Sequence, residues 1–252
     1  METTTNGFEE LKAFSAHLQD VEYDRILEIF TKKIKLFPIT TAIIKQGSTV
    51  DRIRVNRDPH KFFTSEKELS YINDKEILSK MNYFGRANRP NQSIFYGAMY
   101  SENVPNPQAT ACSEAVPMMR DYNFPDGVNV VTLARWRTTE PFEVAEVVFS
   151  QEAIKANDRI RDGFNHHMES VRQLVDEGKL TEAEAKQHSD LLIFVSEQFA
   201  NSKITTDSDY KISCAYTDLI FTKSQLRGIT YPSVRMGYQS ENIALVPEMK
   251  DK

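Results

Sequence analysis

The first part of the chain carries apolar residues at helical spacing between charged ones. This spacing predicts two helices within residues 7–37. Asp20 can cap the second helix, and Pro38 ends it because proline disfavours a helical conformation in the residue before it. The inward faces are Phe8, Leu11, Phe14 and Leu18 in the first helix, and Ile26, Phe30 and Ile34 in the second.

Short runs of β-branched and aromatic residues follow, and they predict strands. The run VDRIRV at Val50–Val55 alternates, so Arg52 and Arg54 are expected on one face of a strand. Two such arginines can line a cleft or can be solvated, and the pattern leaves both possibilities open. The other predicted strands are Ile39–Lys45, Ser93–Ala98, Asn129–Thr138, Phe142–Phe149, a run that starts at Gly228, and Asn242–Val246.

Residues 151–202 change to long, charged, amphipathic segments. One helix is predicted over Gln151–Glu177, and Gly178 can end it. Thr181 and Glu184 form a capping-box pattern for the next helix. The pair predicts a helical hairpin that suits a lid or an interface between copies of a homo-oligomer.

A further helix, capped by Ser208, is expected to run through Phe221. Helices interspersed with short strands predict an α+β domain. The 252 residues suffice for one large domain or two small ones. The sequence contains neither a GxGxxG motif nor a Walker A loop, which argues against a Rossmann dinucleotide site and against a P-loop.

Composition narrows the function classes. The formal net charge of -5 argues against direct nucleic-acid binding, which usually comes with a basic surplus. No apolar run approaches the ~18 residues of a membrane span, and the N-terminus lacks the layout of a signal peptide. Two cysteines, Cys112 and Cys214, do not make a disulfide framework. We therefore expect a soluble, cytoplasmic protein without a membrane partner.

The stretch from Gly85 to Glu114 gathers side chains that suit a ligand. Arg86 lies in its opening turn, Tyr96 in a short strand and Glu114 in a small-residue helix. An arginine fork binds phosphate or carboxylate, a tyrosine offers an aromatic face, and a glutamate can hold a ribose hydroxyl or stabilise a cation. These residues suit a charged, ring-bearing small molecule. A surface arginine, a core tyrosine and a solvated glutamate would give the same pattern.

The helix that carries Glu114 has a clear start. Asn106 is a good N-cap, and a proline follows it at the first helical position. The spacing then places three residues on the inner face: Ala109, Cys112 and Val116. Glu114 is therefore expected to point away from that face, toward a cleft.

Other reactive side chains give weaker evidence for a functional site than those between Gly85 and Glu114. Cys112 is more simply a buried thiol than a nucleophile. His166 and His167 are neighbours on a predicted helix and point about 100° apart, so they make a poor chelating pair and no metal site is predicted. Ser233 is not in a GxSxG elbow, although its hydroxyl can hold a phosphate or a ribose.

Five segments, taken in order, resemble the RES domain, a family named after an arginine, a glutamate and a serine. The segments are GRANRP, IFYGA, ATACSEAV, VVTLARWRTTEPFEVAEVV and GITYPSVRMGYQSENIALVP. The matches to the family's arginine, tyrosine, glutamate and serine are Arg86, Tyr96, Glu114 and Ser233. The run VDRIRV resembles the family's opening strand, whose arginine corresponds to Arg52 or Arg54. The resemblance covers about residues 50–149 and 203–247.

The resemblance implies a fold similar to ADP-ribosyltransferases, with NAD as substrate and no prosthetic group. Many members are bacterial toxins that degrade NAD by hydrolysis or phosphorolysis and are paired with a helix-turn-helix antitoxin. This chain departs from the compact pattern by an N-terminal helical extension, residues 1–49, and by a helical insert, 151–202, within the RES-like catalytic domain, 50–252. These departures put an antitoxin partnership in doubt and suit a self-contained enzyme.

The resemblance also implies roles for the matched residues. Glu114 would stabilise the oxocarbenium-like state that forms when the nicotinamide–ribose bond breaks. Ser233 would bind the ribose or an attacking phosphate, and Tyr96 would stack on the nicotinamide or its ribose.

The pyrophosphate needs cationic forks, which Arg86 and one of Arg52 or Arg54 can supply. Two other functions stay open at this point. One is transfer of ADP-ribose to a macromolecule, and the other is binding of a nucleotide or a partner without chemistry.

Overall fold

The chain has an α+β fold, as the interspersed helices and short strands predict. The computed structural model describes residues 7–34, 37–56, 58, 60–116, 119 and 128–247. The chain divides into two compact units. The helical unit comprises Met1–Thr40, Asn82–Pro90 and Val147–Leu226, and the sheet unit comprises Thr41–Met81, Asn91–Glu146 and Arg227–Lys252.

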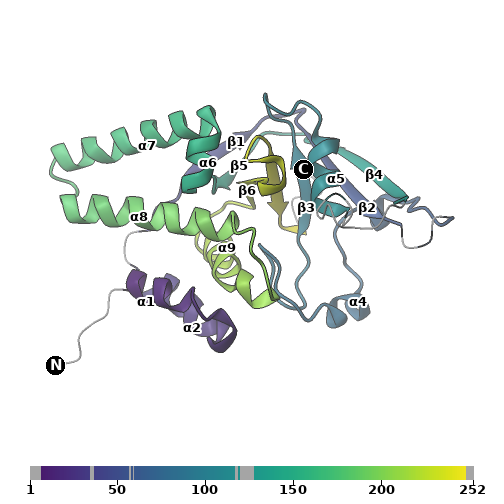
Figure 1. Ribbon diagram of the computed structural model, residues 1–252, viewed down its shortest axis with the longest axis horizontal. Coiled ribbons are helices and arrows are strands. Elements are labelled where there is room, and N and C mark those ends of the chain that lie inside the picture. Colours follow the sequence, from purple (N-terminus) through teal and green to yellow (C-terminus); the bar gives the residue numbers. More distant parts are fainter. Residues whose placement is uncertain are drawn as a thin grey trace. The chain divides into compact units, whose positions relative to one another are not determined.

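The helical unit joins the N-terminal helices to those of the predicted insert (Figure 1). Its helices are α1 (Gly7–Phe14), η1 (Leu18–Asp20), α2 (Tyr23–Glu28), η2 (Ile29–Lys33), α6 (Gln151–Ala156), α7 (Asp158–Asp176), α8 (Glu182–Phe199), η4 (Asp207–Tyr210) and α9 (Lys211–Lys223). Helix α9 is buried over most of its length, and both α2 and α8 pack against it. The insert and the N-terminal extension up to Thr40, which look like separate additions in the sequence, therefore belong to one folded unit. The rest of the predicted extension, residues 41–49, belongs to the sheet unit and includes the strand Thr41–Ile44.

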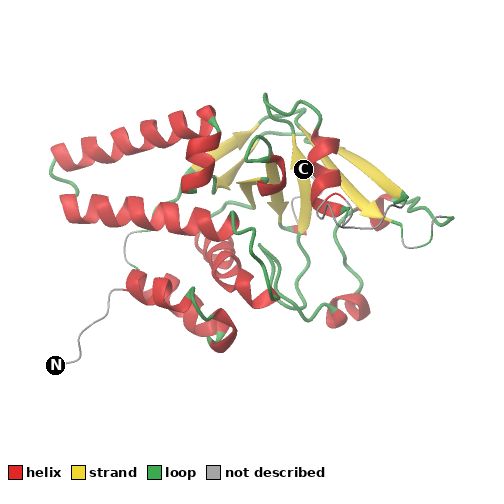
Figure 2. Ribbon diagram, viewed as in Figure 1, coloured by secondary structure: helices red, strands yellow, loops and turns green. Residues whose placement is uncertain are grey.

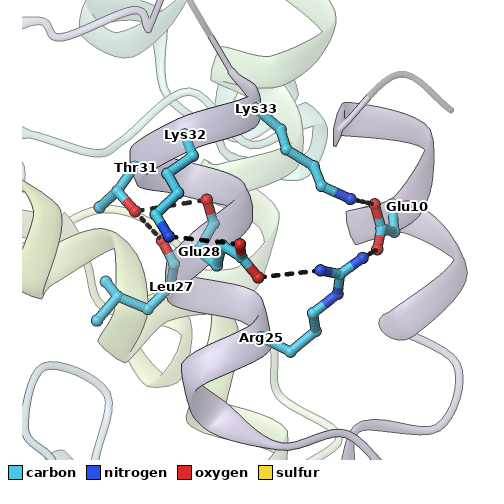
Figure 3. A network of polar contacts seen from close by, with 7 residues as sticks. All are labelled: Glu10, Arg25, Leu27, Glu28, Thr31, Lys32 and Lys33. Atoms are coloured by element: carbon cyan, nitrogen blue, oxygen red, sulfur yellow. Dashed lines mark hydrogen bonds and ion pairs between the residues drawn. The ribbon is translucent and has the colours of Figure 1, made fainter. Parts of the chain in front are cut away.

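Charged side chains tie α1 to α2 and η2 (Figure 3). The Glu10 carboxylate accepts hydrogen bonds from Arg25 Nη2 at 2.6 Å and from Lys33 Nζ at 2.5 Å. Arg25 also donates through Nη1 to Glu28 at 2.9 Å. Burial opposes the charge on Glu10, but the hydrogen bonds from Lys33 and Arg25 outweigh it and lower the pKa of this carboxyl group.

An asparagine divides the predicted helix over Gln151–Glu177 into α6 and α7, so the expectation of a single helix is wrong. Asn157 Oδ1 accepts hydrogen bonds from the backbone N–H groups of Arg159 at 3.1 Å and Ile160 at 3.4 Å, which caps α7. The predicted end of this helix is confirmed, because Gly178 has a φ of +69°.

Two other predicted caps are also wrong. Glu22, and not Asp20, is the N-cap residue of α2, because Asp20 belongs to η1. Thr206, and not Ser208, precedes η4, and its backbone N–H donates to Asp209 at 3.1 Å. Residues 35 and 36, which fall within the second predicted helix, lie outside the described residues.

Helices α7 and α8 form the predicted hairpin and lie side by side (Figure 1). The capping box is confirmed, because Glu184 N–H donates to Thr181 Oγ1 at 3.2 Å and Thr181 N–H to Glu184 Oε2 at 2.9 Å. Between the helices, the rings of His167 and His188 stack with their Nε2 atoms 2.9 Å apart. Burial lowers the pKa of both histidines, and the neighbouring His167 helps to lower the pKa of His188 to about 4.

This histidine pair predicts acid sensitivity. The folded protein keeps His188 neutral down to about pH 4, whereas an unfolded histidine takes up a proton near its usual pKa of 6.5. Stability should therefore fall as pH decreases from 6.5 to 4. Thermal unfolding of His188→Gln across this range should show a shallower dependence than wild type, and His166→Gln, at an exposed position of α7, should not. Identical slopes in all three proteins would contradict the prediction.

The sheet unit contains one mixed sheet of seven described strands (Figure 2). The strands are β1 (Thr41–Ile44), β2 (Thr49–Val55), β3 (Phe95–Met99), β4 (Val131–Arg137), β5 (Phe142–Glu146), β6 (Gly228–Pro232) and β7 (Glu241–Leu245). Their order is β1-β5-β6-β7-β3-β2-β4, and all neighbours are antiparallel except β5 and β6. The short helices of this unit are α3 (Glu66–Leu69), α4 (Lys75–Lys80), α5 (Pro107–Ala115) and η5 (Val234–Met236).

The two faces of this sheet differ in character. One face carries an apolar core of Ile44, Val50, Phe95, Val144 and Ile243. On the other face, strand register aligns one residue from each of four neighbouring strands: Asp51, Ala98, Asn242 and Tyr231. Helix α5 packs against β2 and β3. Its Glu114 carboxylate bonds to the Asn242 side chain, so α5 lies on the face that carries this polar row.

No helix among the described residues combines the length and apolar character needed to cross a bilayer.

Candidate functional site

Helix α5 carries Glu114, and its start is the one that the sequence predicts. The Asn106 side chain accepts from Gln108 N–H at 3.2 Å, and Pro107 occupies the first helical position. The expected inner face is confirmed only for Val116, which is buried, because Ala109 and Cys112 are half-buried. The helix buries three other residues beyond its proline: Thr110, Ala111 and Ser113.

A polar bond to a distant segment explains this rotation of α5. Thr110 Oγ1 donates to Ser240 Oγ at 2.8 Å, whereas Ser113 Oγ satisfies its own hydrogen within the helix, on the Thr110 carbonyl oxygen at 2.8 Å. Because buried hydroxyl groups need partners, the helix turns its small polar residues toward the sheet. Glu114 then faces the polar row of the sheet.

Two side chains hold the Glu114 carboxylate by the same oxygen atom. Ser233 Oγ donates to Oε1 at 2.7 Å, and Asn242 Nδ2 donates to Oε1 at 3.0 Å. The second carboxylate oxygen, Oε2, has no hydrogen-bond partner among the described residues. The glutamate is thus oriented through one oxygen, and the other is available to a ligand.

Ser233 is a positioning residue in this arrangement. It is fully buried, and its Oγ also accepts from Met236 N–H at 3.3 Å. Its single hydroxyl hydrogen is already donated to Glu114, and Ser233 does not border the adjoining cavity. The sequence brings Ser233 to the site as predicted, but its observed contacts are with Glu114 and the η5 backbone.

A cavity of about 260 Å³ is lined in part by Glu114. It lies where β2 and β3 separate, because these strands pair only at Val50–Met99 and Asp51–Ala98, whereas β2 pairs with β4 along its whole length. Its lining is Asp51, Arg52, Ile53, Tyr96, Gly97, Ala98, Ala111, Glu114, Ala115, Tyr231 and Asn242.

Gly97 permits the close approach of the two strands beside the cavity. A Cβ atom at this position would collide with Val50 Cγ1 and would lie 3.2 Å from the Asp51 carbonyl oxygen. A larger residue would therefore push β2 away from β3 where the cavity begins.

Arg52 is a charged residue in the lining of this cavity, and alternation along β2 places its side chain on the sheet face of Val50 and Phe95. Its Nη1 donates to the Tyr96 carbonyl oxygen at 3.0 Å, and its guanidinium lies 5.1 Å from the centre of the Phe95 ring. Its Nε is buried without a hydrogen-bond partner among the described residues, and no described carboxylate pairs with it. Burial, together with the nearby Arg54, lowers the pKa of Arg52 to about 10, so the side chain stays charged at neutral pH.

The other charged residues of β2 are occupied differently. Arg54 shares the strand face of Arg52, as predicted, but its guanidinium lies 5.3 Å from the Phe63 ring and Arg54 does not line the cavity. Asp51 is fully buried and accepts from Arg135 Nε and Nη2, both at 2.8 Å. The geometry therefore distinguishes the two arginines that the sequence left equivalent.

Of the sequence-predicted site residues, Arg86 belongs to the helical unit, where it holds the C-terminal end of α8. Its Nη1 donates to the Phe199 carbonyl oxygen and its Nη2 to that of Asn201 at 3.4 Å. Its guanidinium also lies 5.3 Å from the centre of the Tyr210 ring. A cation suits this position because the last carbonyl groups of a helix lack intrahelical partners.

The second arginine of the same turn is also engaged within the helical unit. Arg89 Nε lies 3.0 Å from Asp218 Oδ2 on α9, and Tyr23 OH donates to the same oxygen at 2.6 Å. Burial raises the pKa of Asp218, although these two partners favour its charged form. Arg86 and Arg89 thus connect the turn to α8 and α9.

The remaining reactive residues do not assemble into a second centre. Burial raises the pKa of the Cys112 thiol, which disfavours the nucleophilic thiolate. His167 bonds to His188, and not to its sequence neighbour. No group of three or more metal-ligating side chains occurs within the described part of the chain.

Comparisons with protein-family models, curated proteins and solved structures found no match to this chain. The case for the candidate site therefore depends on the geometry of its residues alone.

Asn242 is the site residue that sequence reasoning missed as a functional group. The available signal was its place one residue into the last strand, directly after Glu241, and on the same strand face as Ala244. Asn242 is polar, whereas the next two residues, Ile243 and Ala244, are apolar and buried. This contrast would have marked Asn242 as unusual.

The contacts of Arg86 predict a structural role that can be measured apart from ligand binding. Arg86→Ala should lower the free energy of unfolding by about 1–3 kcal/mol, because the carbonyl groups at the end of α8 lose a charged donor. Urea unfolding measures this change, and Arg235→Ala, at an exposed position of η5, is the matched control. If Arg86→Ala keeps wild-type stability and loses only NAD binding, Arg86 does not hold the end of α8 as assigned here.

Proposed function

We propose that this protein is an NAD-degrading enzyme that cleaves the nicotinamide–ribose bond, with Glu114 as the group that stabilises the transition state. The RES resemblance suggests this reaction. The observation that carries the proposal is the anchored Glu114 carboxylate, whose Oε2 atom is left for a ligand beside Arg52 and Tyr96.

The chemistry fits a single oriented carboxylate. Breaking the bond between ribose and nicotinamide leaves positive charge on the ribose, as in glycoside cleavage. A fixed carboxylate stabilises that charge without reorganising, which is the most effective form of electrostatic catalysis. Nicotinamide leaves as a neutral molecule, so no second carboxylic acid is required, and the nearby Asp51 is already paired with Arg135.

The cavity also has groups for the rest of such a substrate. The Arg52 guanidinium is a buried cation without a carboxylate partner among the described residues, and a phosphate that reached it where β2 and β3 separate would complete its bonding. Tyr96 borders the cavity and offers an aromatic ring to the nicotinamide or its ribose. At about 260 Å³ the cavity is smaller than typical sites of ~300–1,000 Å³, so it would enclose only the nicotinamide riboside part.

The same proposal covers the biological setting. We place the chain among RES-type toxins or defence effectors with an ADP-ribosyltransferase-like fold and a cytoplasmic location, where NAD is available. Water or phosphate serves as the acceptor. A helix-turn-helix antitoxin would be its protein partner in a toxin–antitoxin pair, and the hairpin of α7 and α8 would serve a homo-oligomer. The resemblance alone supports these assignments.

Glu114→Gln tests the catalytic assignment. The amide keeps the shape of the side chain and removes its charge, so release of nicotinamide from NAD should slow at least ~100-fold. Affinity for NAD, measured by calorimetry on the same preparation, should fall far less than the rate. Glu102→Gln, at an exposed position before α5, is the control and should react at the wild-type rate.

Equal turnover by wild type and Glu114→Gln would remove Glu114 from the mechanism. Labelling of a protein band by tagged NAD, without free ADP-ribose, would favour transfer of ADP-ribose to a macromolecule.

A further inference from the structure

The amide group of Asn242 forms half of a site that the sequence does not reveal. Asn242 is only 5% exposed, yet it borders the cavity. Its Nδ2 donates to Glu114 Oε1 at 3.0 Å. Because a carboxylate only accepts hydrogen bonds, this contact fixes the orientation of the amide group, and Oδ1 must point away from Oε1.

Two hydrogen-bond acceptors therefore remain at the same wall of the cavity. Asn242 Oδ1 and Glu114 Oε2 have no hydrogen-bond partner among the described residues, and neither atom is fully buried. They belong to residues whose side chains are hydrogen-bonded to each other, which holds the two acceptors in one arrangement. Ser233 adds a second hydrogen bond to Oε1.

We infer that Glu114 and Asn242 together recognise a vicinal diol, one hydroxyl donating to Glu114 Oε2 and its neighbour to Asn242 Oδ1. Adjacent hydroxyl groups on a furanose ring supply two donors side by side, which matches two neighbouring acceptors. A ligand with a single hydroxyl leaves one acceptor without a partner in a closed site, and such a mismatch lowers the affinity strongly.

This inference rests on the proposed function only in naming the diol as that of the nicotinamide ribose. Asn242 then has two tasks, which are to orient the Glu114 carboxylate and to read the second hydroxyl. The catalytic assignment of Glu114 does not require the second task, so each claim can fail without the other.

A matched pair of sugar phosphates tests the diol directly. Ribose 5-phosphate and 2-deoxyribose 5-phosphate carry the same phosphate, so attraction to Arg52 cancels in the comparison. Protein-observed NMR titration of the full chain should give a dissociation constant at least ~10-fold lower for the ribose compound. Equal affinities, or no binding of either compound by folded protein, would overturn the inference, and this comparison needs no variant.

Asn242→Ala locates the preference. The variant should lose most of the discrimination between the two sugars, whereas Asn103→Ala, an exposed amide outside the cavity, should keep it. Asn242→Ser serves as the second variant if alanine prevents folding. A preference that survives both substitutions at 242 would assign diol recognition to other groups and overturn the proposal.

The kinetics distinguish this failure from failure of the proposed function. A chain that prefers ribose 5-phosphate through Asn242 but leaves NAD intact keeps the diol site and loses the NAD-degrading assignment. A chain that releases nicotinamide without any diol preference does the reverse. Where both claims hold, Asn242→Ala should raise the KM for NAD and also lower kcat, because Glu114 loses one of its two donors.

Discussion

The orientation of the Glu114 carboxylate is the constraint on which the site depends. One oxygen receives hydrogen bonds from Ser233 and Asn242, which come from the end of β6 and from β7. The glutamate itself is on α5, which Asn106 starts and which polar bonds of Thr110 rotate toward the sheet. Two segments far apart in sequence, α5 and the neighbouring strands β6 and β7, thus meet at one atom, and the other carboxylate oxygen has no partner among the described residues.

The second constraint is the separation of β2 from β3. After two residue pairs the strands part, and the cavity opens where further pairs would have formed. Arg52 borders this opening with its charge buried and without a carboxylate partner among the described residues. Burying a cation in this way is costly, as the lowered pKa of Arg52 reflects. A buried group with a perturbed pKa beside a cavity is a candidate for a functional role.

Local patterns in the sequence predict the elements of the fold well. The alternation of VDRIRV, the cap at Asn106 and the capping box at Thr181 all appear where the pattern places them. Asn157 was missed because one polar residue inside an amphipathic run can be either a cap or a solvated position. The inner face of α5 was wrong for Ala109 and Cys112, since the apolar pattern ignores buried hydroxyl groups such as those of Thr110 and Ser113.

For the site residues too, local patterns predict the identities, and only tertiary contacts determine the roles. Glu114, Ser233, Tyr96 and Arg52 are all part of the sequence-based prediction. In the sheet unit Glu114, Tyr96 and Arg52 line one cavity, and Ser233 holds Glu114 without bordering it. Their roles depend on tertiary contacts that no local pattern contains. Whether a hydroxyl hydrogen of Ser233 is already donated, whether Arg52 or Arg54 borders the cavity, and which carbonyl groups Arg86 meets are settled only when distant segments pack.

The most direct measurement is incubation of purified wild-type protein with NAD, with and without phosphate, followed by chromatography of the products. The account predicts free nicotinamide. ADP-ribose beside it would identify water as the acceptor, and a product that forms only with phosphate would identify phosphorolysis. Intact NAD after incubation with folded protein would contradict the account.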